Sequence, residues 1–335
     1  NMGLVMPSIS KLGKSAGRLL LITVGIAYSF TLFSGFSTYF ASEAIFPSLL
    51  ENQHIKPMED EQVLTPFFSI QMPPITDVMT ALVLSFIMGI GLSLKEKSVL
   101  SGVIEEFGEI VSWLIAKAII PVLPYYIMSI FAEITFGGKV VSVIEVFFKL
   151  IVVLFVMHIL LLIIQYLIAG VIAKKNPFKS LANMFPAYAT ALGTQSYAAT
   201  IPITLHQAIK MGGAPRIAGF VIPLCATIHL SGSTMKITAC AMALMLLEGM
   251  PFDLELFSGF IMMLGIIMVA APGVPGGAIM AALGILGSML GFNEGQQGLM
   301  IALYVAMDSF GTACNVTGDG AVALIVNKIE EGKGN

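Results

Sequence analysis

Long runs without charge constrain this chain more than any other feature. Residues 150–173 are nearly all Leu, Ile and Val, and His158 is the one His, Lys, Arg, Asp or Glu among them. A helix of that length crosses the hydrocarbon core of a bilayer, which takes about 20 residues. Further candidate spans lie at 19–42, 78–94, 107–133, 216–246 and 295–327. The sequence therefore predicts an all-α polytopic membrane protein.

The composition excludes several other classes of protein. Of the 335 residues, 57% are hydrophobic and 11% are charged, whereas about a quarter are charged in ordinary soluble domains. The formal net charge is −3, without the basic cluster that a nucleic-acid-binding protein needs. The three cysteines lie in apolar runs with no paired spacing, which argues against a disulfide framework or a zinc site.

Two stretches are too long for one straight helix. Residues 180–209 and 256–293 contain no Lys, Arg, Asp or Glu, and each has a centre with Gly and Pro. We interpret both as re-entrant hairpins, in which two half-helices meet at an unwound tip at membrane depth. The alternative is a pair of ordinary kinked spans in each case. Interrupted hydrophobic segments of this kind indicate the substrate site of a transporter.

Lysine and arginine predict the orientation. Successive spans end on opposite sides of the membrane. The ends on one side carry twelve of these residues: Lys11, Lys14, Arg18, Lys95, Lys97, Lys174, Lys175, Lys179, Lys210, Arg216, Lys328 and Lys333. The opposite side carries only Lys56 and Lys139. Because cytoplasmic loops are rich in Lys and Arg, we expect a cytoplasmic C-terminus. Hairpin one then enters the membrane from the cytoplasm and hairpin two from outside.

Two carboxylates lie inside the last apolar segment. Asp308 and Asp319 are eleven residues apart, about three helical turns, so they face nearly the same side of a helix. Ionisable groups at membrane depth are costly and mark functional sites by default. One carboxylate could accept hydrogen bonds from a substrate ammonium and the other could bind a cation.

Four motifs follow one another along the chain: ATIPIT at 199–204, IPLCATIHLSGST at 222–234, PGVPGGAIM at 272–280 and NVTGD at 315–319. Together they resemble motifs of the glutamate transporter family of dicarboxylate/amino acid:cation symporters. NVTGD at 315–319 looks like the last-helix motif of that family, and PGVPGGAIM at 272–280 is similar to the tip of its second hairpin. ATIPIT at 199–204 resembles the stretch after the tip of the first hairpin, and IPLCATIHLSGST at 222–234 lies where the seventh helix is broken. Their order and spacing match, and the likeness covers about residues 15–335.

The resemblance implies a fold of eight spans and two re-entrant hairpins, assembled as a homotrimer in the plasma membrane. The first two spans have no counterpart here, so we expect this to be a fragment or a short version. The implied segments are a third-span equivalent (1–46), an outer loop with scaffold spans (47–133), a sixth-span equivalent (134–179), hairpin one (180–213), a broken seventh span (214–247), hairpin two (254–293), and an eighth span with a cytoplasmic C-terminus (294–335).

The resemblance also implies site residues. Those for the substrate are Asp308, which would bind its amine, together with Gly311, Thr312, Asn315, Ser196 and Tyr197 of hairpin one, and Gly273 and Val274 of hairpin two. One sodium site would use the Asp319 carboxylate, with backbone carbonyls near Cys225, His229 and Asn315. A second, made mostly of carbonyls, would lie near Thr227 and from Val269 to Ala271.

Three departures from the family pattern change the expected chemistry. Gly311 stands where glutamate and aspartate transporters have an arginine for the side-chain carboxylate of the substrate. An acidic substrate would then bury an unpaired charge, so we predict a neutral amino acid. His229 and Ser231 replace an Asn and an Asp, which removes a sodium-binding carboxylate. Lys236 is an added cation; with His229 it could replace a sodium ion or carry a proton, or it could pair with Asp308.

The resulting prediction is a secondary active transporter and not an enzyme. It would move its substrate with sodium, protons or both, and it would need no other cofactor. Alternatives are a symporter for acidic amino acids or dicarboxylates, and an uncoupled facilitator or channel on the same scaffold. An intramembrane enzyme has little support, because no Gly-x-Ser-x-Gly or His-Glu-x-x-His frame places a nucleophile or a metal.

Overall fold

The computed structural model describes residues 17–50, 78–93, 98–114, 117–118, 120–136, 140–269, 271 and 276–331. Within these ranges the regular structure is helical. The helices are α2 (Gly17–Leu50), α3 (Val78–Ser93), α4 (Val99–Leu114), α5 (Ile120–Phe136), α6 (Val140–Ala173), α7 (Pro177–Asn183), α8 (Phe185–Thr194), α9 (Tyr197–Lys210), α10 (Pro215–Ile228), α11 (Ser231–Glu248), α12 (Leu254–Met268), α13 (Gly277–Leu290), α14 (Glu294–Ala306) and α15 (Asp308–Glu331).

Several of these helices have the length and apolar character of membrane spans. Helix α2, helix α6 and the α10–α11 segment each pass that test, and α14 with α15 passes it as a bent pair. Helices α12 and α13 are apolar but shorter. The prediction of an all-α polytopic membrane protein is confirmed.

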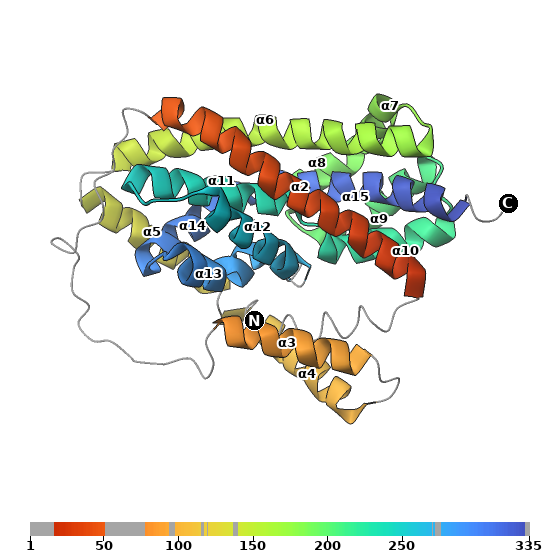
Figure 1. The fold of residues 1–335 in the computed structure, drawn as a ribbon, viewed down its shortest axis with the longest axis horizontal. Helices are drawn as coiled ribbons and strands as arrows, with labels where there is room; N and C mark the ends of the chain where they lie inside the picture. Colours follow the sequence, from red (N-terminus) through yellow and green to blue (C-terminus); the bar gives the residue numbers. More distant parts are fainter. Residues whose placement is uncertain are drawn as a thin grey trace.

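Helices α11 and α15 form the centre of the bundle. Nearly every residue of α11 is buried, and so is the run from Gly311 to Asn327 of α15. Helix α2 packs along α11 and helix α6 packs along α15, so the two long helices cover the central ones (Figure 1). The outward side of α6 exposes large apolar side chains such as Val152, Leu160 and Val171. This is the pattern of a helix that faces lipid on one side and protein on the other.

Two of the predicted spans are broken in the structure. The segment expected at 216–246 is interrupted between α10 and α11, where His229 and Leu230 leave helical geometry. The segment expected at 295–327 bends by 62° between α14 and α15. Met307 caps α14, and Asp308 opens α15 directly after it. The second break therefore places a carboxylate in the first turn of a helix, where the helix dipole favours negative charge.

The two predicted hairpins correspond to two pairs of contacting helices. Helices α8 and α9 are separated by Gln195, in the left-handed region (φ 51°), and Ser196, whose side chain caps α9. Helices α12 and α13 also contact each other, and Gly276 precedes α13 with φ 72°. Glycine adopts that backbone conformation readily. The entry of either pair into the membrane, and the segment boundaries given above, remain predictions.

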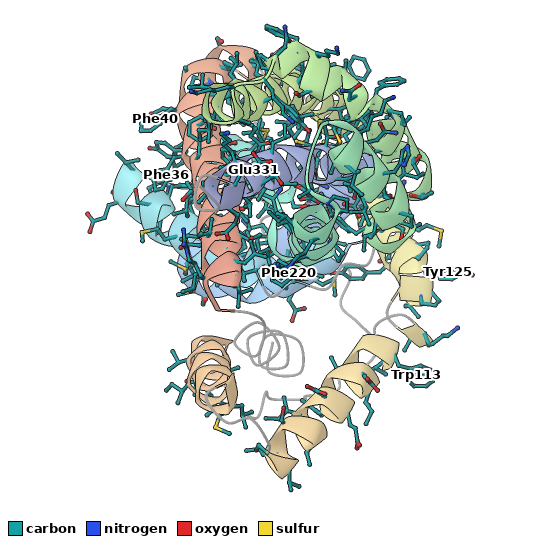
Figure 2. All side chains as sticks on the ribbon, turned by 90° about the vertical axis from the view of Figure 1, so that its right-hand side faces the viewer. Phe36, Phe40, Trp113, Tyr125, Phe220 and Glu331 are labelled. Carbon is teal, nitrogen blue, oxygen red and sulfur yellow. The ribbon has the colours of Figure 1, made fainter. Side chains whose placement is uncertain are left out.

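Helices α3, α4 and α5 lie at the margin of the bundle. Helix α3 contacts α13, and α5 contacts α14 (Figure 1). The candidate span at 107–133 corresponds to the end of α4, which the structure describes to Leu114, and to α5 from Ile120. Trp113 and Tyr125 point away from the bundle (Figure 2). Aromatic side chains of this kind are common at the interface between a membrane and water.

Candidate substrate and cation site

One face of α15 carries four polar side chains inside the apolar bundle. Asp308, Thr312, Asn315 and Asp319 follow at intervals of four, three and four residues, which places them on one side of the helix. All four are buried. Buried polar groups are stable only with partners, so the partners of these four define what the site can do.

Both carboxylate oxygens of Asp308 are occupied. Oδ1 lies 2.9 Å from Nζ of Lys236 on α11, and Oδ2 accepts a hydrogen bond of 2.9 Å from the backbone N–H of Gly276. Gly276 belongs to hairpin two, whose helices are α12 and α13. Asp308 therefore joins three segments that lie far apart in the sequence. The pairing of Lys236 with Asp308, one of the alternatives from the sequence, is the one present in the structure.

Lys236 is completely buried and fully surrounded. Besides Asp308, its ammonium faces the carbonyl of Met307 at 3.5 Å, and it lies 3.5 Å from the centre of the Tyr304 ring. A carboxylate, a carbonyl and an aromatic face together replace the water that a free ammonium would bind. Lys236 is thus a desolvated cation held at the N-terminal end of α15.

Gly311 leaves the space that Lys236 fills. A Cβ atom on residue 311 would lie 2.6 Å from Nζ and 3.1 Å from Cδ of Lys236, and it would also overlap Cε. No side chain larger than hydrogen fits at position 311 while the lysine keeps this conformation. The position where the resemblance leads us to expect an arginine therefore has a cation after all, supplied by α11.

Asn315 connects hairpin one to the centre of the bundle. Its Nδ2 donates to the hydroxyl of Tyr197 at 2.6 Å and to Oγ of Ser233 at 3.0 Å. Its Oδ1 accepts from the backbone N–H of Gly232 at 2.6 Å. The hydroxyl of Tyr304 also donates to Ser233, at 2.9 Å. The predicted substrate residues Tyr197 and Asn315 are in direct contact.

The remaining predicted substrate residues have different surroundings. Ser196 is half-buried and caps α9, accepting from the N–H of Ala199 at 3.3 Å. The Thr312 hydroxyl is buried close to the Tyr197 hydroxyl, without a well-formed hydrogen bond to a described residue. A bound ligand would supply a better partner. Gly273 and Val274 lie outside the described residues.

Asp319 has an imidazole as its direct partner. Oδ1 lies 2.9 Å from Nδ1 of His229, and both side chains are buried. On the far side of the ring, Nε2 of Gln165 lies 3.4 Å from Nε2 of His229 and 3.2 Å from Oγ of Ser231. The Tyr166 hydroxyl donates to the carbonyl of Thr317 at 2.8 Å. Helices α6, α10 and α15 thus meet around this carboxylate.

Some backbone carbonyls expected in the two sodium sites already accept hydrogen bonds within helices. The carbonyl of Cys225 accepts from the N–H of His229 at 2.9 Å, which ends α10. The Thr227 hydroxyl bonds to the carbonyl of Leu224 within the same helix. Val269 ends α12 and Ala271 is buried just beyond it. The second sodium site remains a prediction.

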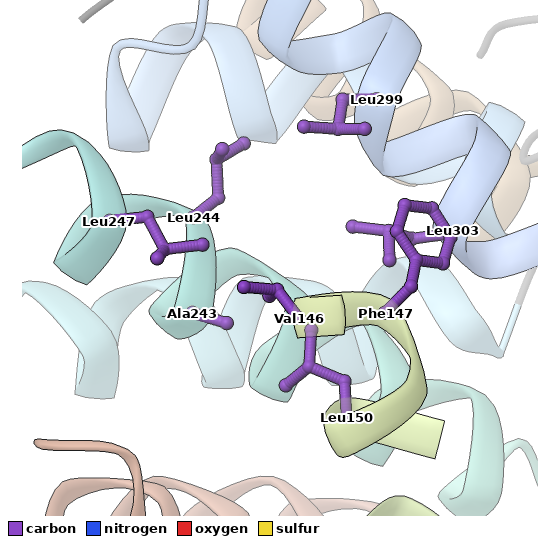
Figure 3. Close-up of a pocket in the computed structure, with 8 residues that line it drawn as sticks. All are labelled: Val146, Phe147, Leu150, Ala243, Leu244, Leu247, Leu299 and Leu303. Carbon is purple, nitrogen blue, oxygen red and sulfur yellow. The ribbon is translucent and has the colours of Figure 1, made fainter. Parts of the chain in front are cut away.

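An apolar pocket elsewhere in the bundle is not part of this site. It lies between α6, α11 and α14 (Figure 3) and is lined by Val146, Phe147, Leu150, Ala243, Leu244, Leu247, Leu299 and Leu303. Its α11 residues begin seven positions after Lys236, two turns along the helix. The lining side chains are all hydrocarbon, so the pocket cannot bind a charged solute.

Several site residues were not recognised from the sequence. Gln165 is the one amide in the apolar run at 150–173, and that isolation is a signal that could have been used. Tyr304 and Ser233 carry no comparable signal, because tyrosine and serine are ordinary residues in membrane helices. Gly276 acts through its backbone N–H, which no residue type reveals.

Comparison of the sequence with known proteins finds one family of transporters. The model of the "Sodium:dicarboxylate symporter family" matches residues 2–329. An excitatory amino acid transporter of Caenorhabditis elegans is 28% identical over 252 residues, 73% of this chain and 50% of that protein. Human excitatory amino acid transporter 2 is 27% identical over 251 residues, 72% of this chain and 43% of that protein. This chain thus spans half or less of the length of these relatives.

Proposed function

Since this chain belongs to the sodium:dicarboxylate symporter family, we propose that it carries a small solute across a membrane together with a cation, by alternating access. We further propose that the solute is an acidic amino acid. The observation that carries the choice is the buried Lys236 ammonium, which lies against Gly311 and pairs with Asp308.

The placement of the two cations favours an acidic substrate. Its ammonium would bind Asp308, and the Lys236 released by that exchange would bind its side-chain carboxylate. Its α-carboxylate would lie at the tip of hairpin one, where the N-terminus of α9 favours negative charge. Each cation then faces a carboxylate, and the third carboxylate faces the positive end of the α9 dipole.

A neutral amino acid has a single carboxylate. If that carboxylate lies at hairpin one, the ammonium of the amino acid competes with Lys236 for Asp308, and one of the two cations faces no carboxylate in an apolar interior. Removing one partner of a buried ion pair costs about 3–5 kcal/mol. The expectation of a neutral substrate rested on the missing arginine at Gly311, and Lys236 now supplies the cation that this expectation lacked.

Sodium is the proposed coupling ion, with protons as the alternative. The family description names sodium, which supports this choice. Because Lys236 is engaged with Asp308, we assign it to substrate binding rather than to proton transfer. His229 remains the candidate for a proton-linked step.

The proposed setting is a homotrimer in the plasma membrane with a cytoplasmic C-terminus. The distribution of Lys and Arg along the sequence supports the orientation. The family resemblance supports the trimer. The lipid-facing side of α6 and the aromatic residues on α4 and α5 support insertion in a bilayer.

The test is uptake by the full-length protein in proteoliposomes. Labelled aspartate, glutamate, alanine, leucine and succinate would be supplied with sodium and proton gradients imposed separately. We expect gradient-driven uptake of aspartate or glutamate, and at least tenfold less of alanine and leucine. Uptake of leucine or alanine with none of aspartate would contradict the acidic substrate. Equal uptake without any gradient would instead support a facilitator.

Two variants assign the cation. Lys236→Ala should lower aspartate uptake at least tenfold, and Lys236→Ala/Gly311→Arg should recover part of it, because the arginine enters the space that the lysine leaves. Lys149→Met is the matched control, since Lys149 pairs with Glu145 on the partly exposed side of α6. It should leave uptake unchanged. A double variant no better than Lys236→Ala would count against the proposed role of Lys236.

A further inference from the structure

The sodium site implied at Asp319 does not fit the side chains around that carboxylate. A sodium ion binds to oxygen lone pairs. In this structure Oδ1 of Asp319 lies 2.9 Å from a ring nitrogen of His229. An oxygen and a nitrogen at this distance attract each other only through a hydrogen between them. That hydrogen bond places the ring at Oδ1, so a cation on this carboxylate would have to share Oδ1 with the imidazole or bind at Oδ2 alone.

The imidazole is fixed in this place by close packing. Its other ring nitrogen faces Gln165, and the Phe30 ring lies 6.1 Å from it, centre to centre. A Cβ on residue 318 would lie 2.6 Å from Cε1 of His229, so Gly318 provides room for the ring. His229 is completely buried. Gln165, Phe30 and Gly318 therefore surround the ring on several sides and hold it beside Asp319.

Neighbouring oxygens at the helix break are used as well. The carbonyl of Ser231 accepts from Oγ of Ser34 at 2.6 Å, and the carbonyl of Gly232 lies 3.1 Å from Nε2 of His158. Ser231 itself brings a hydroxyl, bonded to Gln165, where the family pattern has a carboxylate. The break therefore has fewer free oxygens and one negative charge fewer than the family pattern would provide.

We propose that the His229 side chain occupies the place of a sodium ion at Asp319. This chain then binds one cation fewer along α15 than a chain with Asn at 229 and Asp at 231. The inference rests on membership of a cation-coupled family and not on the choice of an acidic substrate. Any remaining sodium dependence would come from a site that does not include Asp319.

The test measures sodium binding without a substrate. The full-length protein would be purified, and its melting temperature followed as sodium chloride replaces choline chloride at constant ionic strength. A bound ion stabilises the folded protein in proportion to the logarithm of its concentration. The variants are Asp319→Asn, His229→Asn/Ser231→Asp, and the triple variant that combines all three changes.

We expect Asp319→Asn to leave the sodium dependence of the melting temperature within twofold of the original slope. His229→Asn/Ser231→Asp should increase the slope by one bound ion, and adding Asp319→Asn should remove that increase. If the double variant does not elute as a folded species, His229→Asn alone takes its place.

Two results would overturn the proposal. One is a loss of sodium response caused by Asp319→Asn in the otherwise unchanged chain. The other is a folded His229→Asn/Ser231→Asp variant that gains no sodium response. Because no substrate is present, neither result bears on whether aspartate is transported, and a failure of aspartate uptake would leave this test intact.

Discussion

Two acid–base pairs lie on α15, eleven residues apart, and they differ in what else they contact. Asp308 pairs with Lys236 and also accepts from Gly276 of hairpin two, at the start of α13. Asp319 pairs with His229 inside a junction of α6, α10 and α15, with no hydrogen bond to either hairpin among the described residues. The first pair can change partners when a hairpin moves, whereas the second is fixed by long helices.

The difference shows that burial alone does not distinguish a working ion pair from a structural one. Both pairs are almost completely buried, and both have a separation of 2.9 Å. The difference lies in the contact with Gly276 of hairpin two, which the Asp308 pair has. Substitutions at the two pairs should therefore have different consequences for stability and for uptake.

Asp308→Asn should have the largest effect. It leaves the Lys236 ammonium buried without a countercharge, which should lower the free energy of unfolding by about 3–5 kcal/mol and abolish uptake. Asp308→Asn/Lys236→Met should recover most of the stability but none of the uptake, as measured by denaturant unfolding in detergent and by proteoliposome assay. Uptake by the double variant would mean that the pair is structural only.

Asp319→Asn should be milder and of a different kind. Loss of a hydrogen bond to a charged group should cost about 1.5–3 kcal/mol of unfolding free energy. The substrate concentration for half-maximal uptake should stay the same, because Asp319 has no hydrogen bond to either hairpin within the described part of the chain. A tenfold rise in that concentration would remove the distinction between the two pairs.

Gly311→Ala tests the packing of the first pair. The added methyl group would overlap Lys236, and overpacking of this kind costs about 1–3 kcal/mol. The matched control is Gly219→Ala on α10, where a Cβ would meet nothing within 4 Å. Equal unfolding free energies for the two variants would show that Lys236 adjusts without cost.

Tyr197→Phe should have the smallest effect on stability. It removes the hydroxyl that accepts from Asn315 at 2.6 Å, worth about 1 kcal/mol. The loss should favour an open position of hairpin one, seen as faster labelling of a cysteine placed at Ser196. An unchanged labelling rate would show that the Tyr197–Asn315 contact does not hold the hairpin.

The sequence predicted the helical class and the carboxylate face of α15 well. Asp308 and Asp319 lie inside an apolar segment, and helical spacing is enough to place both on one side. The bend at Met307 was not predicted, because the residues around it include no proline and Met307 itself is a good helix former. It depends on tertiary contacts, in which Asp308 joins Lys236 and Gly276.

The partnership of Lys236 with Gly311 could not be read from either residue alone. They lie 75 positions apart. The sequence does not show whether the space beside a helical glycine is empty or is filled by another side chain. Likewise His229 was recognised as a departure from the family pattern, but its distance from Asp319 depends on how α10 ends. Both cases require the packing of three helices, which periodicity does not describe.

The close fit between Gly311 and Lys236 also restricts the order in which such a site can change over generations. A lysine at 236 in this conformation and a large side chain at 311 exclude each other, because their atoms would share the same space. A lineage that moves the cation from one helix to the other must first lose the old one. Its intermediate would have no cation at this position and would suit a neutral solute. The path from a protein with its cation at position 236 to one with its cation at position 311 therefore passes through a protein with a different substrate.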